Sequence, residues 1–463
     1  MKYKVVVFFV FILLFGITLR LYQIATQSYW LDEMFSLYIA KQSGWNSLTW
    51  DSNPFLYHFL LRYWVQLWGE NEFFVRLLSS LFSLGSATTM YFVGKKLGGI
   101  KLGLAVMTLA LLHPVSIEYA QEARMYALLE LLTALNLYFF LFVSNERKYL
   151  IGWIVTLILL SLTHLFSFFV IIAEVFWWFH RRNNKATQKY FWAVSLFVLA
   201  GFLIVVKTTG LDVRFLDWQK LRYDINGPAT DLLKLLSVPG MGSAWGCLLI
   251  PLLIWTLPKT QRNQILNEQS FQFLLGTVAF SIAMAFLFSL ALERTFLLPR
   301  YFIFLIPFVA LIYSLLVEKA WQQKGRHRAL AVFVSLGLLS GTALAWTDIY
   351  KYKKAPWRNV AQYIYHIRNP IVLTTRSQTI QTPYFERYLI PVRKWTPDEL
   401  GLQEITDLVE AQNNVFIVEN YWGGLLYWEN VKALMTQKSY KINEQIFKVG
   451  ESEELYLMQI RKN

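Results

Sequence analysis

Two adjacent carboxylates follow the first apolar segment of the chain, in the order Trp30-Leu31-Asp32-Glu33. One of them could cap the helix expected to begin at Met34, but two adjacent residues cannot both cap the same helix start. The other carboxylate is then a candidate for chemistry, either as a general base or as an oxygen ligand for a hard cation.

The densest cluster of polar residues runs without a break from Glu118 to Tyr126. On a helix, Glu118, Glu122 and Tyr126 would share one face, with Gln121 beside them and Arg124 pointing elsewhere. Such a stripe can bind an anion or a divalent cation, or it can form salt bridges. Because residues two apart do not face each other on a helix, a salt bridge of Arg124 would need a partner from another segment.

Two further polar clusters lie in Asp51-Ser52-Asn53-Pro54 and in Glu293-Arg294 with Pro299-Arg300-Tyr301. The first is typical of a turn that starts a helix, and Asn53 and the nearby His58 are candidate site-lining residues. The arginines at 294 and 300 are suited to a phosphate, because the guanidinium group binds two oxygens at once.

Other polar residues within the apolar runs are expected to be satisfied by neighbouring helices: His164, Glu130 and Glu174. No HExxH-type metal motif and no glycine-rich phosphate loop is present. The single cysteine, Cys247, excludes an intrachain disulfide and a cysteine metal cluster.

The elements that must position these residues are mainly apolar helices. Of the 463 residues 56% are hydrophobic and 16% charged, and the mean hydropathy of +0.38 is too high for a soluble protein. The composition predicts an α-helical polytopic membrane protein. About eleven spans are expected, at residues 5–21, 73–93, 102–116, 126–143, 149–163, 165–179, 190–206, 244–257, 271–292, 301–317 and 329–346.

The net charge of +14 reports orientation rather than nucleic-acid binding. Six short segments, at 2–4, 95–101, 146–148, 181–189, 259–262 and 318–328, hold 17 basic residues and two acids. They alternate along the chain as cytoplasmic segments should, which predicts a cytoplasmic N-terminus. The four polar clusters then fall at the outer boundary.

Three outer pieces are large: residues 22–72, 207–243 and the tail. The run 55–68 is too short for a further span and is expected to be an interfacial helix within the first loop. The expected domains are therefore a membrane domain at 1–346 and a soluble extracytoplasmic α/β domain at 347–463. In the tail we expect strands at 371–375, 415–419 and 455–460 and a helix at 357–368.

The order of motifs along the whole chain resembles the GT-C glycosyltransferases of family 39 and their relatives. That group includes protein O-mannosyltransferases, lipid A aminoarabinose transferases and galacturonosyltransferase-like enzymes of the bacterial lipopolysaccharide core. The motifs are Trp30-x-Asp32-Glu33, Asn53-Pro-Phe-Leu-Tyr57, Glu72-Phe-x-x-Arg76-Leu, Tyr119-Ala-Gln-Glu-Ala-Arg-Met-Tyr126, Leu298-Pro-Arg-Tyr301 and Lys354-Ala-Pro-Trp357-Arg358.

The resemblance implies an inverting transferase in the bacterial inner (plasma) membrane. It would move a sugar from a polyprenyl-phosphate donor to a lipid, glycan or protein acceptor on the extracytoplasmic face. Asp32 resembles the family's catalytic base, and Glu33 would orient the site or assist a metal. Arg124, Arg300 and Arg294 would bind the donor phosphate. The residues expected to line the site are Asn53, His58, Glu118, Gln121, Glu122, Tyr126 and Tyr301.

No cofactor is required by these residues. A divalent cation, Mg²⁺ or Mn²⁺, held weakly by Asp32, Glu33 and Glu122 stays open. The chain has Ser52-Asn53-Pro54-Phe55 where aminoarabinose transferases carry Glu-Lys-Pro-Pro, so neither lipid A modification nor zinc binding is implied. The alternative function is a transporter or flippase of lipid-linked saccharides, which would place charges on both faces of a central cavity.

Overall fold

The computed structural model describes residues 2–51, 53–143, 147–180, 203, 227–291 and 296–351, and in the tail 354–375, 384–385, 389–395, 399–411, 414–420, 428–447 and 454–462. The chain divides into two compact units. The first comprises Met1–Ile24 with Ile39–Thr347, and the second comprises Ala25–Tyr38 with Asp348–Asn463. The division after Thr347 lies one residue from the one expected from composition, but Ala25–Tyr38 groups with the tail rather than with the helices. The two units are therefore described one at a time.

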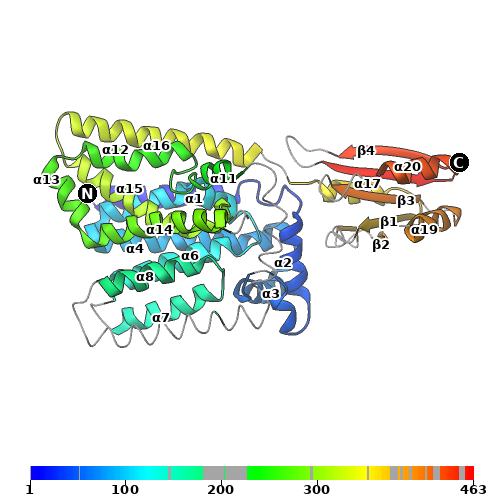
Figure 1. Cartoon of the computed structure of the whole chain (residues 1–463), viewed down its shortest axis with the longest axis horizontal. Coiled ribbons are helices and arrows are strands. Elements are labelled where there is room, and N and C mark those ends of the chain that lie inside the picture. The colour runs from blue at the N-terminus through cyan, green and yellow to red at the C-terminus, as the bar shows by residue number, and fades with distance from the viewer. Residues whose placement is uncertain are drawn as a thin grey trace. The chain divides into compact units, whose positions relative to one another are not determined.

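The first unit is a bundle of helices that run side by side (Figure 1). Each apolar segment expected to span, where it lies in the described residues, coincides with a helix or with one leg of a helix. The segment 190–206 lies outside the described residues except for Leu203. The helices in these segments are α1 (Lys2–Leu21), α4 (Glu72–Leu112), α6 (Tyr126–Leu141), α7 (Arg147–Ser161), α8 (Ser167–His180), the short α12 (Leu249–Thr256), α14 (Gln269–Ala291), α15 (Ile306–Trp321) and α16 (Arg326–Lys351).

Helix α4 turns back on itself at Gly98 and Gly99, which have non-helical backbone angles. Gly99 has φ of +84°, a conformation that glycine adopts at little cost. A Cβ atom added to Gly94 would lie 2.9 Å from the Cα atom of Gly103. On a straight helix two residues nine apart would be about 14 Å apart. The two legs of α4 therefore correspond to the two spans expected at 73–93 and 102–116.

Few of the described helices reach full bilayer length. By length and composition, Gln269–Ala291, Pro299–Trp321 and His327–Lys351 are long and apolar enough to cross a membrane, and the bent pair of α4 with α5 (Pro114–Ala120) would make a fourth. Shorter apolar helices include Val5–Leu21, Tyr126–Leu141 and Ser167–Trp178. A bundle can contain such short helices where neighbouring helices cover them. The total of eleven spans stays a prediction.

The centre of the bundle is the segment η3 (Pro299–Leu305) followed by α15. From Phe302 to Tyr313 its side chains are completely or almost completely buried. Across from it, α4 presents a row of buried serines that allows α5 and α6 to approach closely. These serines are Ser79, Ser80, Ser83 and Ser86.

A buried polar network ties α1 to the centre of the bundle. Arg20 is fully buried and its guanidinium donates to Ser83 Oγ, to Ser116 Oγ and to the carbonyls of Gly16 and Leu111, at 2.9–3.2 Å. Ser116 in turn donates to Glu130 Oε2 at 2.8 Å, and Ser86 donates to Glu130 Oε1 at 3.1 Å. Glu130 thus has the neighbouring partners that its place in an apolar run predicts, whereas nothing in the sequence marks Arg20. We call this set the Arg20–Glu130 network.

Short helices lie between the long ones, several of them at the bundle ends. They are η1 (Asn46–Thr49), α3 (Leu56–Trp68), α5, α11 (Gly227–Leu235), η2 (Ala244–Leu248) and α13 (Lys259–Asn267). Helix α2 (Leu31–Lys41) belongs mainly to the second unit. The helix expected at 55–68 is present as α3, which buries Tyr57, His58 and Leu61 and exposes Leu67 and Trp68. It is amphipathic, as an interfacial helix should be.

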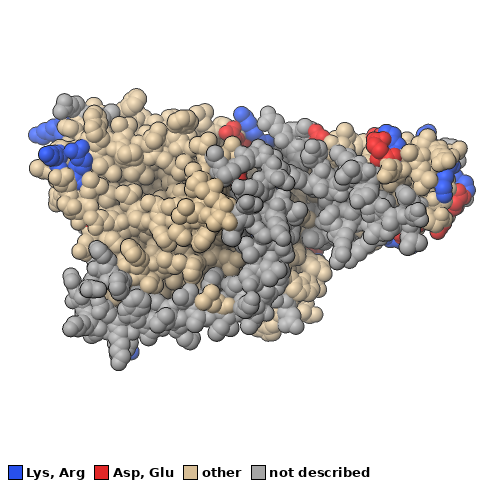
Figure 2. Space-filling view, viewed as in Figure 1, with Lys and Arg blue, Asp and Glu red and all other residues tan. Residues whose placement is uncertain are grey.

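The charges of the bundle are distributed unevenly. Figure 2 shows Lys and Arg side chains at the end where α13 lies, and Figure 1 shows the N-terminus and the α15–α16 turn at that end as well. The described flank along α12 and α16 carries almost no charge in this view. Helix α3 lies at the opposite end. Three of the segments expected to be cytoplasmic, 2–4, 259–262 and 318–328, therefore share one end of the bundle.

The tail forms a five-stranded sheet in the order β2-β1-β3-β5-β4. The strands are β1 (Pro370–Thr375), β2 (Val392–Trp395), β3 (Asn414–Asn420), β4 (Lys441–Phe447) and β5 (Leu455–Arg461). Strand β1 is parallel to β2 and β3, whereas β5 is antiparallel to β3 and β4. The helices α17 (Trp357–Tyr365), α19 (Glu399–Glu410) and α20 (Trp428–Gln437) complete the unit.

The core of this second unit lies between the sheet and the helices α19 and α20, and it includes Leu373, Ile405, Val415 and Met458. The expected α/β composition is confirmed, with the three expected strands in place as β1, β3 and β5. The expected helix 357–368 ends earlier, at Tyr365. Strands β2 and β4 were not anticipated; β4 is an edge strand with an exposed face, so its apolar alternation is weak.

Candidate functional site

The carboxylates at 32 and 33 lie in the first turn of α2, in the second unit, and they have different surroundings. Glu33 is completely buried, and its Oε2 accepts hydrogen bonds from the backbone N–H of Trp30 at 3.2 Å and from Lys354 Nζ at 3.1 Å. Asp32 is only partly buried. Glu33 therefore caps the helix, and Asp32 is the more accessible carboxylate.

The segment before α2 is fixed by the residues that follow α16. Lys354 donates its backbone N–H to Gln27 Oε1 at 3.0 Å, and its ammonium lies 5.8 Å from the centre of the Trp30 ring. Arg358 donates its backbone N–H to Ser28 Oγ at 3.1 Å. The block Lys354-Ala-Pro-Trp357-Arg358, singled out in the sequence, thus positions the start of α2.

A divalent cation does not fit these carboxylates well. The Lys354 ammonium already occupies the position at Glu33 Oε2 that a cation would need. Within the described ranges, no three His, Cys, Asp or Glu side chains gather into a group that could hold a metal ion. The weak site expected at Asp32, Glu33 and Glu122 is not among such groups, and no step of the chemistry below is routed through a metal.

A second set of polar side chains lies in the first unit, around a buried ion pair. Arg124 Nη1 lies 2.7 Å from Asp51 Oδ2, and both side chains are nearly inaccessible. Asp51 Oδ1 also accepts the backbone N–H of Asn53 at 2.9 Å and its amide at 3.2 Å. Arg124 therefore has the partner from another segment that its sequence position required. Asp51 was expected only to form a turn, and it does so while binding Arg124.

His58, from α3, completes this group. Its Nε2 lies 3.6 Å from Asp51 Oδ2, and the ring is completely buried. Burial lowers the pKa of His58 to about 4, with Asp51 opposing the shift and Arg124 adding to it. Burial by itself disfavours the charge on Asp51, yet Arg124 and His58 hold the pKa of this carboxyl well below its ordinary value. The pair is ionised and the histidine is neutral at pH 7.

The segment that carries Arg124 is a tight turn rather than a helix, which corrects the expected stripe of Glu118, Glu122 and Tyr126. Helix α5 ends at Ala120 and α6 begins at Tyr126. The turn is held by the backbone bond from Arg124 N–H to the Glu122 carbonyl at 2.8 Å and by Ser80 Oγ donating to the Ala120 carbonyl at 2.8 Å. Tertiary contacts therefore override the helical periodicity here.

Gln121 has a role that differs from the expected one. Its amide donates to the carbonyls of Leu19, Arg20 and Tyr22 at 3.0–3.1 Å, so it satisfies the C-terminal end of α1. Glu118, at the last turn of α5, is partly buried and Glu122 is nearly buried. The Gln121 amide thus supports the end of α1, and the expectation that Gln121, Glu118 and Glu122 line the site stays a prediction.

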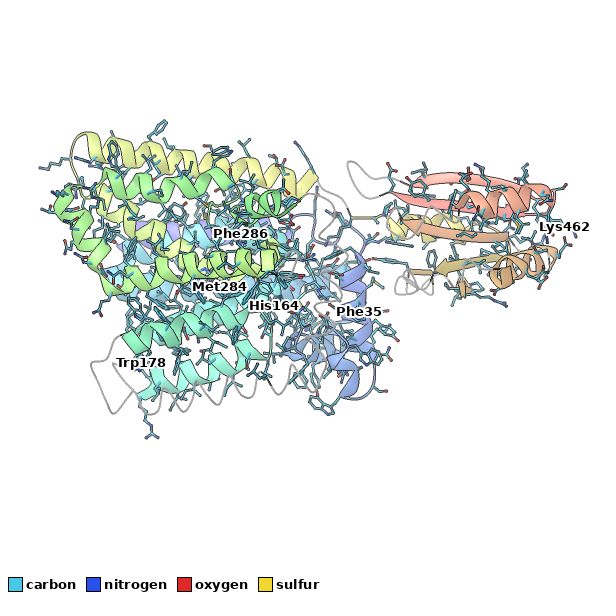
Figure 3. All side chains as sticks on the ribbon, viewed as in Figure 1. Phe35, His164, Trp178, Met284, Phe286 and Lys462 are labelled. Carbon is cyan, nitrogen blue, oxygen red and sulfur yellow. The ribbon has the colours of Figure 1, made fainter. Side chains whose placement is uncertain are left out.

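An aromatic group borders the ion pair. The ring of His164, in the turn between α7 and α8, lies 5.9 Å from the ring of Tyr126 and 5.6 Å from that of Tyr301. The Arg300 guanidinium lies 5.5 Å from the Tyr301 ring, and His164 interacts electrostatically with Asp51, Arg124 and Arg300. Figure 3 labels His164 toward the α3 end of the bundle. We call Asp51, Arg124, His58, His164 and Arg300 the Arg124 cluster.

The structure thus brings together, within one unit, many of the residues chosen from sequence. It joins Asn53, His58, Arg124, Tyr126, Arg300 and Tyr301, and it adds Asp51 and His164. Arg294 lies outside the described residues. The sequence predicts only contacts with neighbouring helices for His164. The feature that could have marked it as a site residue is its place in a tight turn between two apolar runs, where a polar ring is costly unless it has a hydrogen-bond partner.

No protein-family model and no curated protein sequence matches the chain. Solved structures do match it in fold. ArnT from Cupriavidus metallidurans bound to undecaprenyl phosphate has a TM-score of 0.62 at 14% identity over 97% of both chains, and its apo state has a TM-score of 0.59 at 13% identity. An oligosaccharyltransferase from Archaeoglobus fulgidus tethered with an acceptor peptide has a TM-score of 0.57 at 9% identity, over 97% of this chain and 73% of that one.

Both neighbours have the GT-C fold of multi-pass membrane glycosyltransferases. The chain therefore has a GT-C fold with a small C-terminal sheet, as its motif order led us to expect.

Proposed function

We propose that the protein is a membrane glycosyltransferase that takes a sugar from a polyprenyl-phosphate donor and gives it to an acceptor on the extracytoplasmic face of the bacterial inner membrane. The observation that carries the proposal is the Arg124 cluster, which holds two guanidinium groups and two buried imidazoles. The fold that holds this cluster aligns over 97% of the chain with ArnT, which was crystallised with undecaprenyl phosphate. The transporter alternative has no comparable support.

The chemistry assigns separate tasks to the carboxylates and the arginines. In an inverting transfer, the acceptor hydroxyl oxygen attacks the anomeric carbon while its proton passes to a base, for which we propose Asp32. The bond from that carbon to the phosphate oxygen breaks, and its electron pair stays on the phosphate. Arg124 and Arg300 are the proposed partners of the leaving phosphate, because guanidinium groups stabilise the charge that develops there. No acid catalyst is needed, since a phosphate leaves without protonation.

Glu33 is proposed to position α2 rather than to react. It is buried and paired with Lys354, whereas Asp32, the next residue along the same turn, is partly exposed. The remaining candidates, Glu118, Glu122, Tyr126 and Tyr301, would line the acceptor or sugar pocket. The identity of the sugar and of the acceptor depends on pocket shape.

The test is a transfer assay with purified protein in lipid nanodiscs and a small panel of polyprenyl-phosphate sugars, scored by loss of donor. We expect wild-type protein to consume at least one donor. Asp32→Asn should lower transfer by about 10²–10⁴-fold, the contribution typical of a general base, with folding and donor binding retained. Glu70→Gln, which alters an exposed carboxylate paired with Lys41, is the matched control and should transfer normally. Undiminished turnover by Asp32→Asn would contradict its assignment as the base.

A further inference from the structure

The histidine in the turn between α7 and α8 has its proton position fixed by the backbone. His164 Nδ1 accepts the N–H of Phe166 at 3.0 Å, so this nitrogen carries no proton. Burial lowers the pKa of His164 to about 3; Asp51 opposes the shift, and Arg124 and Arg300 reinforce it. The ring is neutral at pH 7, and its single proton is on Nε2.

The Nε2–H of His164 is a buried donor without an acceptor among the described residues. The side chain is completely buried, and Nε2 has no hydrogen-bond partner among the residues that the structure describes. A buried donor left without an acceptor costs about 1–3 kcal/mol. The Arg20–Glu130 network in the same bundle shows that this chain can provide partners for buried polar groups when their role is structural. We therefore explain the unsatisfied donor of His164, within the Arg124 cluster, by an acceptor that binds there.

The charged groups that act on His164 favour an anion as the acceptor. His164 interacts electrostatically with Asp51, Arg124 and Arg300, whose charges sum to one positive, while the ring itself is neutral. Arg124 pairs with Asp51 through Nη1. Arg300 is only partly buried, and its guanidinium lies near the Tyr301 ring that also contacts His164. A phosphate would balance the net charge and accept the imidazole N–H at the same time. A sugar hydroxyl would balance no charge.

We propose that His164 donates its Nε2–H to an oxygen of the donor phosphate, beside Arg300 and Arg124. This inference rests on the proposed function, which makes that phosphate part of a polyprenyl phosphate. The same chemistry would also recognise free inorganic phosphate. His164 thus acts as a neutral donor whose strength does not change with pH near neutrality, because it cannot take up a second proton in this surrounding.

Two substitutions separate the donor from the turn. His164→Asn keeps an acceptor near the position of Nδ1 for the Phe166 N–H but removes the donor at Nε2. His164→Gln places an amide N–H near the position of Nε2 instead. His366→Asn, an exposed histidine at the end of α17, is the matched control. Each variant is titrated in nanodiscs with undecaprenyl phosphate, with undecaprenol and with inorganic phosphate, and its thermal midpoint is measured.

We expect His164→Asn to weaken undecaprenyl phosphate binding by about tenfold or more, as for a hydrogen bond to a charged group, and His164→Gln to recover part of the loss. Binding of undecaprenol and the thermal midpoint should stay close to wild type. Wild-type affinity for inorganic phosphate equal to that for the lipid phosphate would assign the interaction to phosphate alone, with no contribution from the lipid.

The inference is overturned if His164→Asn binds undecaprenyl phosphate as wild type does, or if it loses undecaprenol equally, which would indicate packing. It is also overturned if wild-type protein binds neither the lipid phosphate nor phosphate. The proposed function is judged separately by transfer. If no donor is consumed but the phosphate-specific loss in His164→Asn is seen, the inference stands and the proposed function fails.

Discussion

Two buried polar groups lie in the helical bundle, and they differ in how their hydrogen bonds are satisfied. In the Arg20–Glu130 network, each nitrogen of the Arg20 guanidinium and each oxygen of the Glu130 carboxylate has a partner within the bundle. In the Arg124 cluster, both nitrogens of His58 and Nε2 of His164 have no hydrogen-bond partner within the described part of the chain, and neither has Oδ1 of the adjacent Asn53. His58 and His164 are as completely buried as Arg20 and Glu130.

We interpret the first group as polar residues that stabilise the fold and propose that the second binds a ligand. A fully satisfied network adds stability and fixes one arrangement of helices, whereas an incompletely satisfied one carries a cost that folding alone does not explain. The Arg20–Glu130 network joins α1, α4, α5 and α6. The Arg124 cluster is supplied by loops, turns and helix ends, where reacting groups are commonly placed.

The largest effect is expected from exchanging two polar residues of each group for apolar ones. In the network, Arg20→Met alone should cost about 3–5 kcal/mol of unfolding free energy, because Ser83, Ser116 and the Leu111 carbonyl lose the buried donor that they share, and Arg20→Met/Glu130→Leu should recover part of that loss. In the cluster, Asp51→Leu/Arg124→Met should likewise fold. It should nevertheless lose transfer by about 10²–10³-fold, because a group that stabilises the leaving phosphate is gone.

Chemical denaturation in detergent and the donor-loss assay measure both halves of this prediction. Transfer should stay within a few fold of wild type in the folded Arg20→Met/Glu130→Leu protein. Normal transfer by the Asp51→Leu/Arg124→Met protein would show that the two groups do not differ in function.

An intermediate effect is expected from acid. The pKa of His58 is lowered from 6.5 to about 4, so the unfolded chain takes up a proton below pH 6.5 that the folded chain refuses until about pH 4. The unfolding free energy therefore falls as the pH drops through this window. Asp51 adds little loss there, because the unfolded chain protonates this carboxyl only near its ordinary pKa of 3.8, below the window.

The thermal midpoint of wild type and of His58→Phe, measured from pH 7.5 to 4.5, checks this sign. The midpoint difference, variant minus wild type, should rise as the pH falls, because phenylalanine removes the titration. A constant difference across the range would contradict the buried, neutral state of His58.

The smallest effect is expected from single substitutions, one of a side chain with hydrogen-bond partners and one of a side chain without them. Ser86→Ala removes the hydrogen bond to Glu130 Oε1 and should lower the unfolding free energy by about 1–2 kcal/mol. His58→Phe at pH 7.5 should lower it by less or raise it, because both ring nitrogens lack hydrogen bonds and the apolar replacement needs none. Urea titration of both variants measures these free energies. Equal losses of unfolding free energy would contradict the distinction between the two groups.

The sequence by itself determined the class of the fold and the candidate chemistry. Apolar runs fix helices because their side chains must leave water, and alternating apolar residues fix the strands β1, β3 and β5 in the tail. Charge placement and motif order marked Asp32, Arg124 and Arg300. These features are local in the chain, or they repeat along it, so no contact between distant segments was needed to find them.

Only the tertiary structure decided which polar residues serve the fold and which stay available. It joined Arg124 to Asp51, 73 positions away, and assigned Gln121 to the end of α1 and Glu33 to Lys354. It also ended α5 at Ala120, against the helical pattern. The reason is physical: a buried polar group must find its partner wherever the chain brings one near, and hydrogen-bond satisfaction is a property of space rather than of spacing.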